Sequence, residues 1–291
     1  MTTKREEPST AYLRVGTTIY KRDQQPLSSG RSIETLLAWN VETLRQDFGK
    51  DYLARIPKYD GFCTVPDHTN YRREIHGFLN RYEPIPFHPA EGDFPHIRGF
   101  LSHIFGEQVE MEYDYLQLLY LRPLQRLPVL LLVSSERNTG KTTFLNLLKL
   151  IFGGNVTFNT NEDFRSQFND DWAGKLLICV DEVLLNRRED SERIKNLSTA
   201  RSYKAEAKGR DRREVEFFGK FVLCSNNERN PVLIEAAETR YWVRRIPPPT
   251  YYQRYTITYN GLPQRQESKT ARIYTVTRKL LDELLNDVSG L

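Results

Sequence analysis

Cysteines are few and long apolar runs are missing from this 291-residue sequence. Its three cysteines, Cys63, Cys179 and Cys224, lie far apart, and no two of them form a CxxC pair. This disfavours a disulfide-stabilised secreted domain and a cysteine-based zinc site. The longest apolar run, Val129–Val133, is far shorter than the roughly 20 residues that a membrane-spanning helix needs. We therefore expect a reduced protein without a membrane segment.

A secretory signal and a strong charge of either sign are also missing. The first residues, MTTKREEPST, lack the apolar stretch of a signal peptide, which predicts a cytoplasmic location. The 42 basic and 38 acidic side chains leave a net charge of +4, too small by itself to indicate a nucleic-acid partner. Hydrophobic residues make up 39% and aromatic residues 12%, which is enough for a folded core and excludes global disorder.

The first part of the chain mixes strand, helix and irregular patterns. Residues 11–20 combine aromatic and β-branched side chains, as strands do. Ser32 is a candidate N-cap for a helix that runs to Gly49, with apolar residues at steps of three and four. Five prolines interrupt residues 50–92, and two helical stretches follow between Asp93 and Leu121.

From residue 128 onwards, short apolar strands alternate with helical or charged segments. Apolar strands separated by helices are typical of a parallel sheet that is buried on both faces. The expected strands are Val129–Val133, Leu176–Val180, Phe221–Cys224 and Tyr241–Ile246. We therefore divide the chain into a mainly helical region at 1–127, which is a candidate oligomerising collar, an α/β core at 128–247 and an extension at 248–291 that ends in an amphipathic helix.

The first of these strands leads into the loop SSERNTGKTT and then a helix with one apolar face. A strand, a tight loop ending in GKT and a helix are the context of a phosphate-binding loop, where backbone N–H groups face the phosphates. Lys141 would contact the β- and γ-phosphates, and the Thr142 hydroxyl would bind Mg²⁺. The pattern usually begins with glycine where this sequence has Ser135, and a chance GKT in an ordinary loop is the alternative. The expected nucleotide-binding residues are Ser135, Glu136, Arg137, Asn138, Thr139, Gly140, Lys141, Thr142 and Thr143.

Two further strands end in polar side chains. The strand that ends at Val180 is followed by Asp181 and Glu182, the acidic pair expected to accompany a phosphate-binding loop. Asp181 would hold Mg²⁺ through water, and Glu182 would orient or deprotonate the attacking water. The next strand leads into Ser225 and Asn226, whose amide would contact the γ-phosphate or align the water. The alternatives are two solvated carboxylates at a strand end and an ordinary turn.

In this order and spacing, SERNTGKTT, LLICVDE and FVLCSNN resemble motifs A, B and C of the superfamily 3 helicases, which are AAA+ proteins of viruses, phages and mobile elements. The likeness is to the helicase part of phage- and plasmid-type primase–helicases. It covers residues 128–246 and extends more weakly over 80–127. It implies an AAA+ P-loop NTPase core with ATP and Mg²⁺ as cofactors, Thr142 and Asp181 at the metal, and Glu182, Asp181 and Asn226 in catalysis.

The resemblance also implies a DNA-contacting hairpin and an arginine finger. The hairpin would have Lys208 at its turn, with Lys204 and Arg210 as further DNA-binding residues. Residues 201–213 hold six basic and two acidic side chains, a local charge of +4. Arg240 resembles the finger that reaches the neighbouring subunit's nucleotide, with Arg244 and Arg245 as substitutes. A solvated charged hairpin and a salt-bridged surface arginine are the alternatives.

The function that the resemblance implies is ATP-dependent translocation on, and unwinding of, single-stranded or forked DNA by a homo-oligomeric ring, a hexamer, in the replication of a virus, phage or mobile element. A primase or an origin-binding protein would be a partner. Three alternatives stay open: an AAA+ ATPase that remodels nucleoprotein without unwinding, a small-molecule P-loop kinase, and a DNA-binding ring that does not hydrolyse ATP. The basic hairpin disfavours the kinase, and the Asp181-Glu182 pair disfavours the ring without hydrolysis.

Overall fold

The structure is a computed structural model that describes residues 11–26, 32–85, 87, 90–166, 172–205, 213–235 and 237–248. The predicted extension after residue 248 and two predicted DNA-binding residues, Lys208 and Arg210, lie outside the described residues. The chain separates into two compact units, with 11–65 and 72–82 in the first and 66–71 and the residues from 83 onwards in the second.

The first unit is built mainly of strands. A four-stranded sheet has the order β3-β2-β1-β4, and a three-stranded sheet has the order β5-β7-β6. Two short helices, α2 and α3, cover an aromatic cluster in which Tyr12, Phe48 and Tyr52 make edge and stacked ring contacts. The elements are β1 (Tyr12–Val15), β2 (Thr18–Pro26), β3 (Ser32–Trp39), α2 (Val41–Phe48), α3 (Tyr52–Arg55), β4 (Lys58–Tyr59), β5 (Gly61–Cys63), β6 (Glu74–Ile75) and β7 (Phe78–Asn80).

The helix predicted from Ser32 to Gly49 is wrong over its first half. Residues 32–39 form β3, which pairs with β2 in an antiparallel ladder from Ile19↔Trp39 to Pro26↔Ser32. The helix begins only at Val41, because the Asn40 side chain accepts the N–H of Glu42 at 2.7 Å and caps it. Long-range pairing along a whole strand thus outweighs the helical spacing of the apolar residues. The description of 1–127 as mainly helical is accordingly wrong for the described residues 11–82.

The second unit contains the predicted parallel sheet. Its five strands have the order β14-β8-β13-β10-β9, and every neighbouring pair is parallel. The four predicted core strands are confirmed to within one residue at either end, and β9 is an additional edge strand. The elements are α4 (Pro95–Phe105), η1 (Gly106–Gln108), α5 (Val109–Leu121), β8 (Val129–Val133), α6 (Lys141–Phe152), η2 (Gly153–Asn155), β9 (Val156–Asn159), α7 (Asn161–Arg165), β10 (Leu177–Val180), α8 (Arg188–Thr199), β11 (Ser202–Ala205), β12 (Arg213–Glu216), β13 (Lys220–Ser225) and β14 (Tyr241–Arg245).

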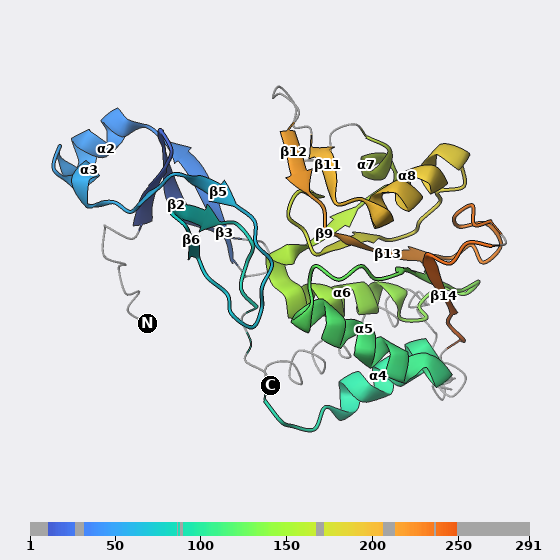
Figure 1. The fold of residues 1–291 in the computed structure, drawn as a ribbon. Coiled ribbons are helices and arrows are strands. Elements are labelled where there is room, and N and C mark those ends of the chain that lie inside the picture. The colour runs from blue at the N-terminus through green and yellow to red at the C-terminus, as the bar shows by residue number, and fades with distance from the viewer. Residues whose placement is uncertain are drawn as a thin grey trace, which may run out of the picture. The chain divides into compact units, whose positions relative to one another are not determined.

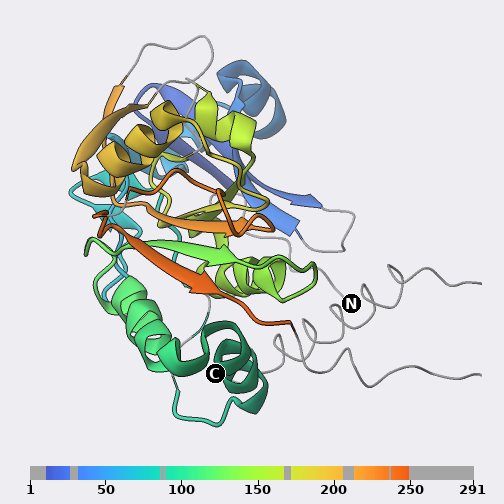
Figure 2. The same cartoon turned by 90° about the vertical axis from the view of Figure 1, so that its right-hand side faces the viewer.

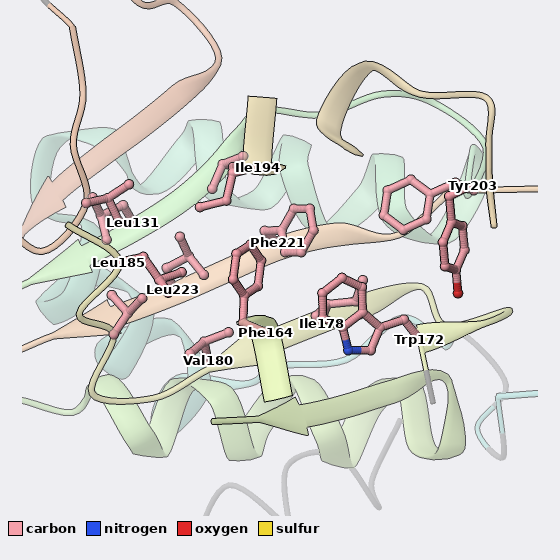
Figure 3. Packing of buried hydrophobic residues seen from close by; sticks show 14 of the residues in the cluster. Leu131, Phe164, Trp172, Ile178, Val180, Leu185, Ile194, Tyr203, Phe221 and Leu223 are labelled. Carbon is pink, nitrogen blue, oxygen red and sulfur yellow. The ribbon is translucent and has the colours of Figure 1, made fainter. Parts of the chain in front are cut away.

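Helices cover both faces of this sheet (Figure 1). On one face, side chains of α7 and α8 pack against alternate residues of β8, β10 and β13, in the cluster drawn in Figure 3. On the other face lies α6, whose Phe144 meets Phe105 of α4 at 5.3 Å between ring centroids. The three central strands β8, β13 and β10 are buried from both sides, which explains why each reads as an almost continuous apolar run.

Helices α4 and α5 belong to the second unit and lie on the α6 side of the sheet (Figures 1 and 2). Trp242 of β14 contacts the rings of Phe105 and Tyr115 at 5.3 and 5.7 Å between centroids, which attaches both helices to the sheet. The division between the units therefore falls near residue 82 rather than at 127/128. No helix among the described residues is long and apolar enough to cross a membrane.

Candidate nucleotide-binding and catalytic site

The candidate loop (residues 134–140) joins the carboxyl end of β8 to the amino end of α6. Two of its residues have a positive φ: Asn138 at 61° and Gly140 at 101°. This conformation brings a Cβ atom close to the following carbonyl oxygen; glycine has no Cβ, and the short polar side chain of asparagine can compensate by local hydrogen bonding. Ser135 is not among the residues with positive φ. The backbone therefore does not require a glycine at the first position of the pattern.

Helix α4 packs against the candidate loop. A Cβ atom at Gly140 would lie 2.9 Å from Ile104 Cδ1 and 3.1 Å from Phe100 Cε2, so glycine is required here by space as well as by φ. His103 Nε2 lies 3.0 Å from the carbonyl oxygen of Thr139. The turn into α6 is thus packed against a second helix.

Lys141 is the first residue of α6, and the residue is only 6% exposed. Its ammonium group donates to Thr139 Oγ1 at 3.1 Å and to the carbonyl oxygen of Glu136 at 3.4 Å. Burial lowers the pKa of Lys141, while the nearby carboxylates of Asp181 and Glu228 oppose that shift. A buried ammonium folded back onto the candidate loop can bind an anion that enters it.

Thr142 and Asp181 form the contact between α6 and the end of β10. The Thr142 hydroxyl donates to Asp181 Oδ2 at 2.7 Å. Both groups are hard oxygen donors of the kind that Mg²⁺ prefers, one from the loop–helix junction and one from a strand end. The residues present therefore fit a magnesium ion that accompanies a bound phosphate. Among the described residues, no cluster of three or more His, Cys, Asp and Glu side chains is placed to hold a metal without such a ligand.

Glu182 lies in an acidic turn (residues 181–184) with an unusual backbone. Its φ is 53°, and its side chain is exposed. Asn161, the first residue of α7, holds this turn on both sides: its amide donates to the Glu182 carbonyl oxygen at 3.1 Å and accepts the Leu184 N–H at 2.8 Å. Arg165 of the same helix donates to the Leu184 carbonyl oxygen at 2.8 Å. Helix α7 therefore fixes the direction in which Glu182 leaves the sheet.

Strand β13 lies between β8 and β10 and brings its own polar end to the same edge. The Ser225 carbonyl oxygen accepts the Ser134 N–H at 3.2 Å, and the Ser225 hydroxyl donates to the Val183 carbonyl oxygen at 2.9 Å. Ser225 thus ties the candidate loop to the acidic turn. Asn226 follows directly and is half-buried. Predicted residues from three strand ends meet at one edge, the place where open α/β sheets bind ligands.

Arg240 does not reach this edge within its own chain. It precedes β14, and its carbonyl oxygen accepts the N–H of Val129 at the start of β8. The length of β14, roughly 15 Å, separates it from the candidate loop. Its guanidinium pairs with Glu238 at 2.6 Å. A role of Arg240 at the nucleotide is therefore restricted to the site of a neighbouring subunit.

The two arginines named as substitutes have different surroundings. Arg244 donates to the carbonyl oxygen of Ile104 at 2.9 Å and pairs with Glu107 at 2.8 Å, so it fastens β14 to the end of α4. Arg245 is at the carboxyl end of β14, pairs with Glu228 at 3.0 Å and is 71% exposed. Of these arginines, Arg245 is the one that lies beside the candidate loop of its own chain.

The predicted hairpin is described in its two arms. Strands β11 and β12 pair antiparallel from Ser202↔Glu216 to Ala205↔Arg213. Lys204 is on β11, opposite Glu214. The hairpin leads through residues 217–219 directly into β13, so its base is at the amino end of the strand whose carboxyl end borders the candidate loop.

Sequence reasoning missed Asn161, Glu228 and His103. Each contacts the backbone of the candidate site: Asn161 and His103 from helices without a recognised motif, and Glu228 from the position directly after FVLCSNN. A signal existed for Asn161 alone: the Thr160–Asp163 capping box, which marks the start of α7 directly before it.

Comparisons with known proteins place this chain near a phage replication protein. A family described only as of unknown function (DUF5906) matches residues 132–245. The DNA primase-polymerase of Nitratiruptor phage NrS-1 is 24% identical over 246 residues, which are 81% of this chain and 31% of that protein. The chain therefore spans about a third of the length of this relative.

Solved structures show which fold the chain shares. The apo structure of the NrS-1 C-terminal region (305–718) matches with a TM-score of 0.64 and 19% identity, over 96% of this chain and 66% of that chain. A structure of the JCV helicase matches with a TM-score of 0.37 and 15% identity, over 67% and 53% of the two chains. The fold is thus of the kind found in the NrS-1 C-terminal region.

Proposed function

We propose that this protein is an ATP-dependent DNA helicase or translocase of superfamily 3 type that acts as an oligomeric ring in the replication of a phage. The observation that carries the proposal is the 2.7 Å hydrogen bond between Thr142 and Asp181. Lys141 directly precedes Thr142 in the sequence, and Glu182 directly follows Asp181. This arrangement brings a cation, two metal ligands and an exposed carboxylate to one sheet edge. Such a set suits phosphoryl transfer to water.

The chain's own residues divide the work of hydrolysis. The backbone N–H groups of residues 138–142 and the amino end of α6 bind the phosphates, and Lys141 supplies a positive charge from a buried side chain. Thr142 and Asp181 would hold a magnesium ion, which would neutralise charge on the phosphates. Glu182 accepts the proton of the attacking water at its carboxylate, and Asn226 orients that water.

The exposed carboxylate of Glu182 argues against a purely structural nucleotide site. A ligand that only stabilises the ring has no use for a base held in a left-handed backbone conformation by Asn161. The site thus supports turnover, and a DNA-binding ring without hydrolysis is the weaker hypothesis.

The hairpin formed by β11 and β12 is the proposed DNA contact. Its basic residues, Lys204 with Lys208 and Arg210 beyond the described residues, would track phosphates without reading the base sequence. A ring, a hexamer in this proposal, would bring the hairpins of all subunits into one channel. Similarity to a phage DNA primase-polymerase supports a role in phage replication, with a primase activity as the partner of this chain.

Steady-state ATPase and fork-unwinding assays on three variants test the proposal. Lys141→Ala should lose nucleotide binding and hydrolysis together. Glu182→Gln should keep binding and lose about 10²- to 10³-fold in turnover, because a general base contributes on this scale. Glu189→Gln, an exposed glutamate at the start of α8, is the matched control and should behave as wild type.

Each outcome decides something. Wild-type turnover by Glu182→Gln would remove the catalytic assignment. DNA-stimulated ATPase without strand separation on a fork would replace the helicase with an AAA+ ATPase that remodels nucleoprotein. A monomer that phosphorylates a small molecule would reject both.

A further inference from the structure

A chain of three residues joins the carboxyl ends of β14, β8 and β13. Glu228 lies in the loop after β13, and its Oε1 accepts the N–H of Ser135 at 2.6 Å. Its Oε2 pairs with the guanidinium of Arg245 at 3.0 Å. Arg245 ends β14 opposite Val133, the last residue of β8. The Glu228 carboxylate therefore binds Ser135, the first residue of the phosphate-binding pattern, and is itself bound by Arg245 of β14.

The bond to Ser135 is of the strong kind. Hydrogen bonds to an ionised carboxylate are shorter and roughly twice as strong as neutral ones, and the Glu228 side chain is only 20% exposed. Ser135 itself is exposed. Within the described part of the chain, the hydrogen bond that connects Ser135 to another element is the one from its N–H to Glu228. The start of the loop thus depends on a side chain that lies 93 positions further along.

We propose that Glu228 is a positioning residue that fixes the start of the candidate loop and so sets the affinity for nucleotide, with Arg245 acting through it. This inference rests on the proposed function. The usual pattern has glycine where this chain has Ser135, and here the residue at that place is restrained by a carboxylate.

The charge of Glu228 does not oppose this role. Arg245 pairs with the same carboxylate, so its negative charge is compensated before a phosphate enters. This compensation favours a loop that is ready for an anion.

The experiment has one readout without nucleotide and one with it. Hydrogen exchange of a peptide covering residues 134–140 reports the restraint of the loop in the nucleotide-free protein. Glu228→Ala should speed this exchange about tenfold, and Glu228→Gln, whose amide oxygen can still accept the Ser135 N–H, should restore most of the protection. Glu235→Ala is the matched control, because Glu235 is in the same β13–β14 connection but pairs with Lys195 of α8 at 3.2 Å.

The second readout is ATPase kinetics with the same variants. Glu228→Ala should raise KM for ATP about tenfold and leave kcat at saturating ATP unchanged, and Glu228→Gln should return KM to within about threefold of wild type. Arg245→Ala should raise KM in the wild-type background and add nothing in the Glu228→Ala background.

The outcomes separate this inference from the proposed function. Unchanged loop exchange in Glu228→Ala overturns the inference, whatever the protein does with ATP. A fall in kcat at constant KM, or independent effects of Arg245 and Glu228, overturns it as well. If exchange differs among the variants as expected but the wild-type protein binds no nucleotide, the proposed function is wrong, while the restraint of the loop by Glu228 still holds.

Discussion

The hydroxyl of Thr142 donates to the carboxylate of Asp181 at 2.7 Å, although 39 positions separate the two residues. Thr142 lies at the start of α6, which the candidate loop joins to β8, and Asp181 directly follows β10; β13 lies between the two strands. The contact therefore spans an intervening strand. It forms because both side chains lean across the carboxyl edge of the sheet.

This pair predicts how magnesium affects nucleotide affinity. Thr142→Ala removes the hydroxyl ligand, so adding Mg²⁺ should no longer raise the affinity for nucleotide, whereas Thr142→Ser should respond as wild type does. Titration calorimetry with and without chelator measures the difference. An equal magnesium effect in wild type and Thr142→Ala would contradict the assignment of this metal ligand.

The backbone of Glu182 predicts opposite effects on stability and activity. A non-glycine residue at a φ of 53° costs on the order of 1 kcal/mol, which glycine avoids. Glu182→Gly should therefore raise the free energy of unfolding by about 0.5–1 kcal/mol and abolish ATP hydrolysis. Urea denaturation measures the first effect. In contrast, Glu189→Gly in the first turn of helix α8 should lower the free energy of unfolding, by at most about 1 kcal/mol.

Asn161 should act on turnover more than on binding. Its amide makes two hydrogen bonds to the backbone of the acidic turn, so Asn161→Ala should cost about 1–2 kcal/mol of stability and release Glu182. We expect kcat to fall about tenfold with little change in nucleotide affinity. Asn196→Ala, an exposed asparagine on α8, serves as the control. A loss of nucleotide binding with an intact kcat would contradict this prediction, because Asn161 would then support nucleotide binding rather than the position of Glu182.

The hairpin predicts a salt effect. Lys208→Ala should weaken DNA binding and reduce the slope of log affinity against log salt by about one unit for each phosphate that the lysine neutralises in the wild-type complex. ATPase activity without DNA should persist, since the paired arms β11 and β12 end at the far side of the sheet from the candidate loop. An unchanged slope would assign Lys208 to an ordinary solvated surface.

Arg240 predicts complementation between two inactive variants. Because it lies at the opposite edge of the sheet from its own candidate loop, it can serve only a neighbouring subunit. Rings that mix Arg240→Ala with Lys141→Ala subunits contain interfaces with an intact loop on one side and an intact arginine on the other. Part of the ATPase activity should return on mixing. Mixed rings with no activity at any ratio would remove the support for action in trans.

Much of the second unit was predictable, because buried parallel strands and the glycine-containing loop leave local patterns in the sequence. Strand β9 was not, since it has only four residues at a sheet edge, and of its two middle residues one is half-buried and the other exposed. Residues 32–39 were misread because Leu37 and Val41 fit a helical spacing, while the pairing with β2 that decides their structure is visible only in three dimensions. Asn161 and Glu228 contact backbone atoms of other elements; the capping box at Thr160 marks only where α7 begins, and the contacts themselves have no sequence signature.

The backbone angles of the candidate loop predict which of its positions can vary among related chains. Residue 135 has an ordinary φ and can accept any side chain that leaves its N–H free for Glu228. The positive φ of residue 138 favours asparagine or glycine, and residue 140 needs glycine because of both its φ and the space around it. A sequence search that demands glycine at the first position discards chains of this type. A pattern that asks for asparagine or glycine at the position of Asn138, for glycine at the position of Gly140 and for glutamate at the position of Glu228 would retrieve them.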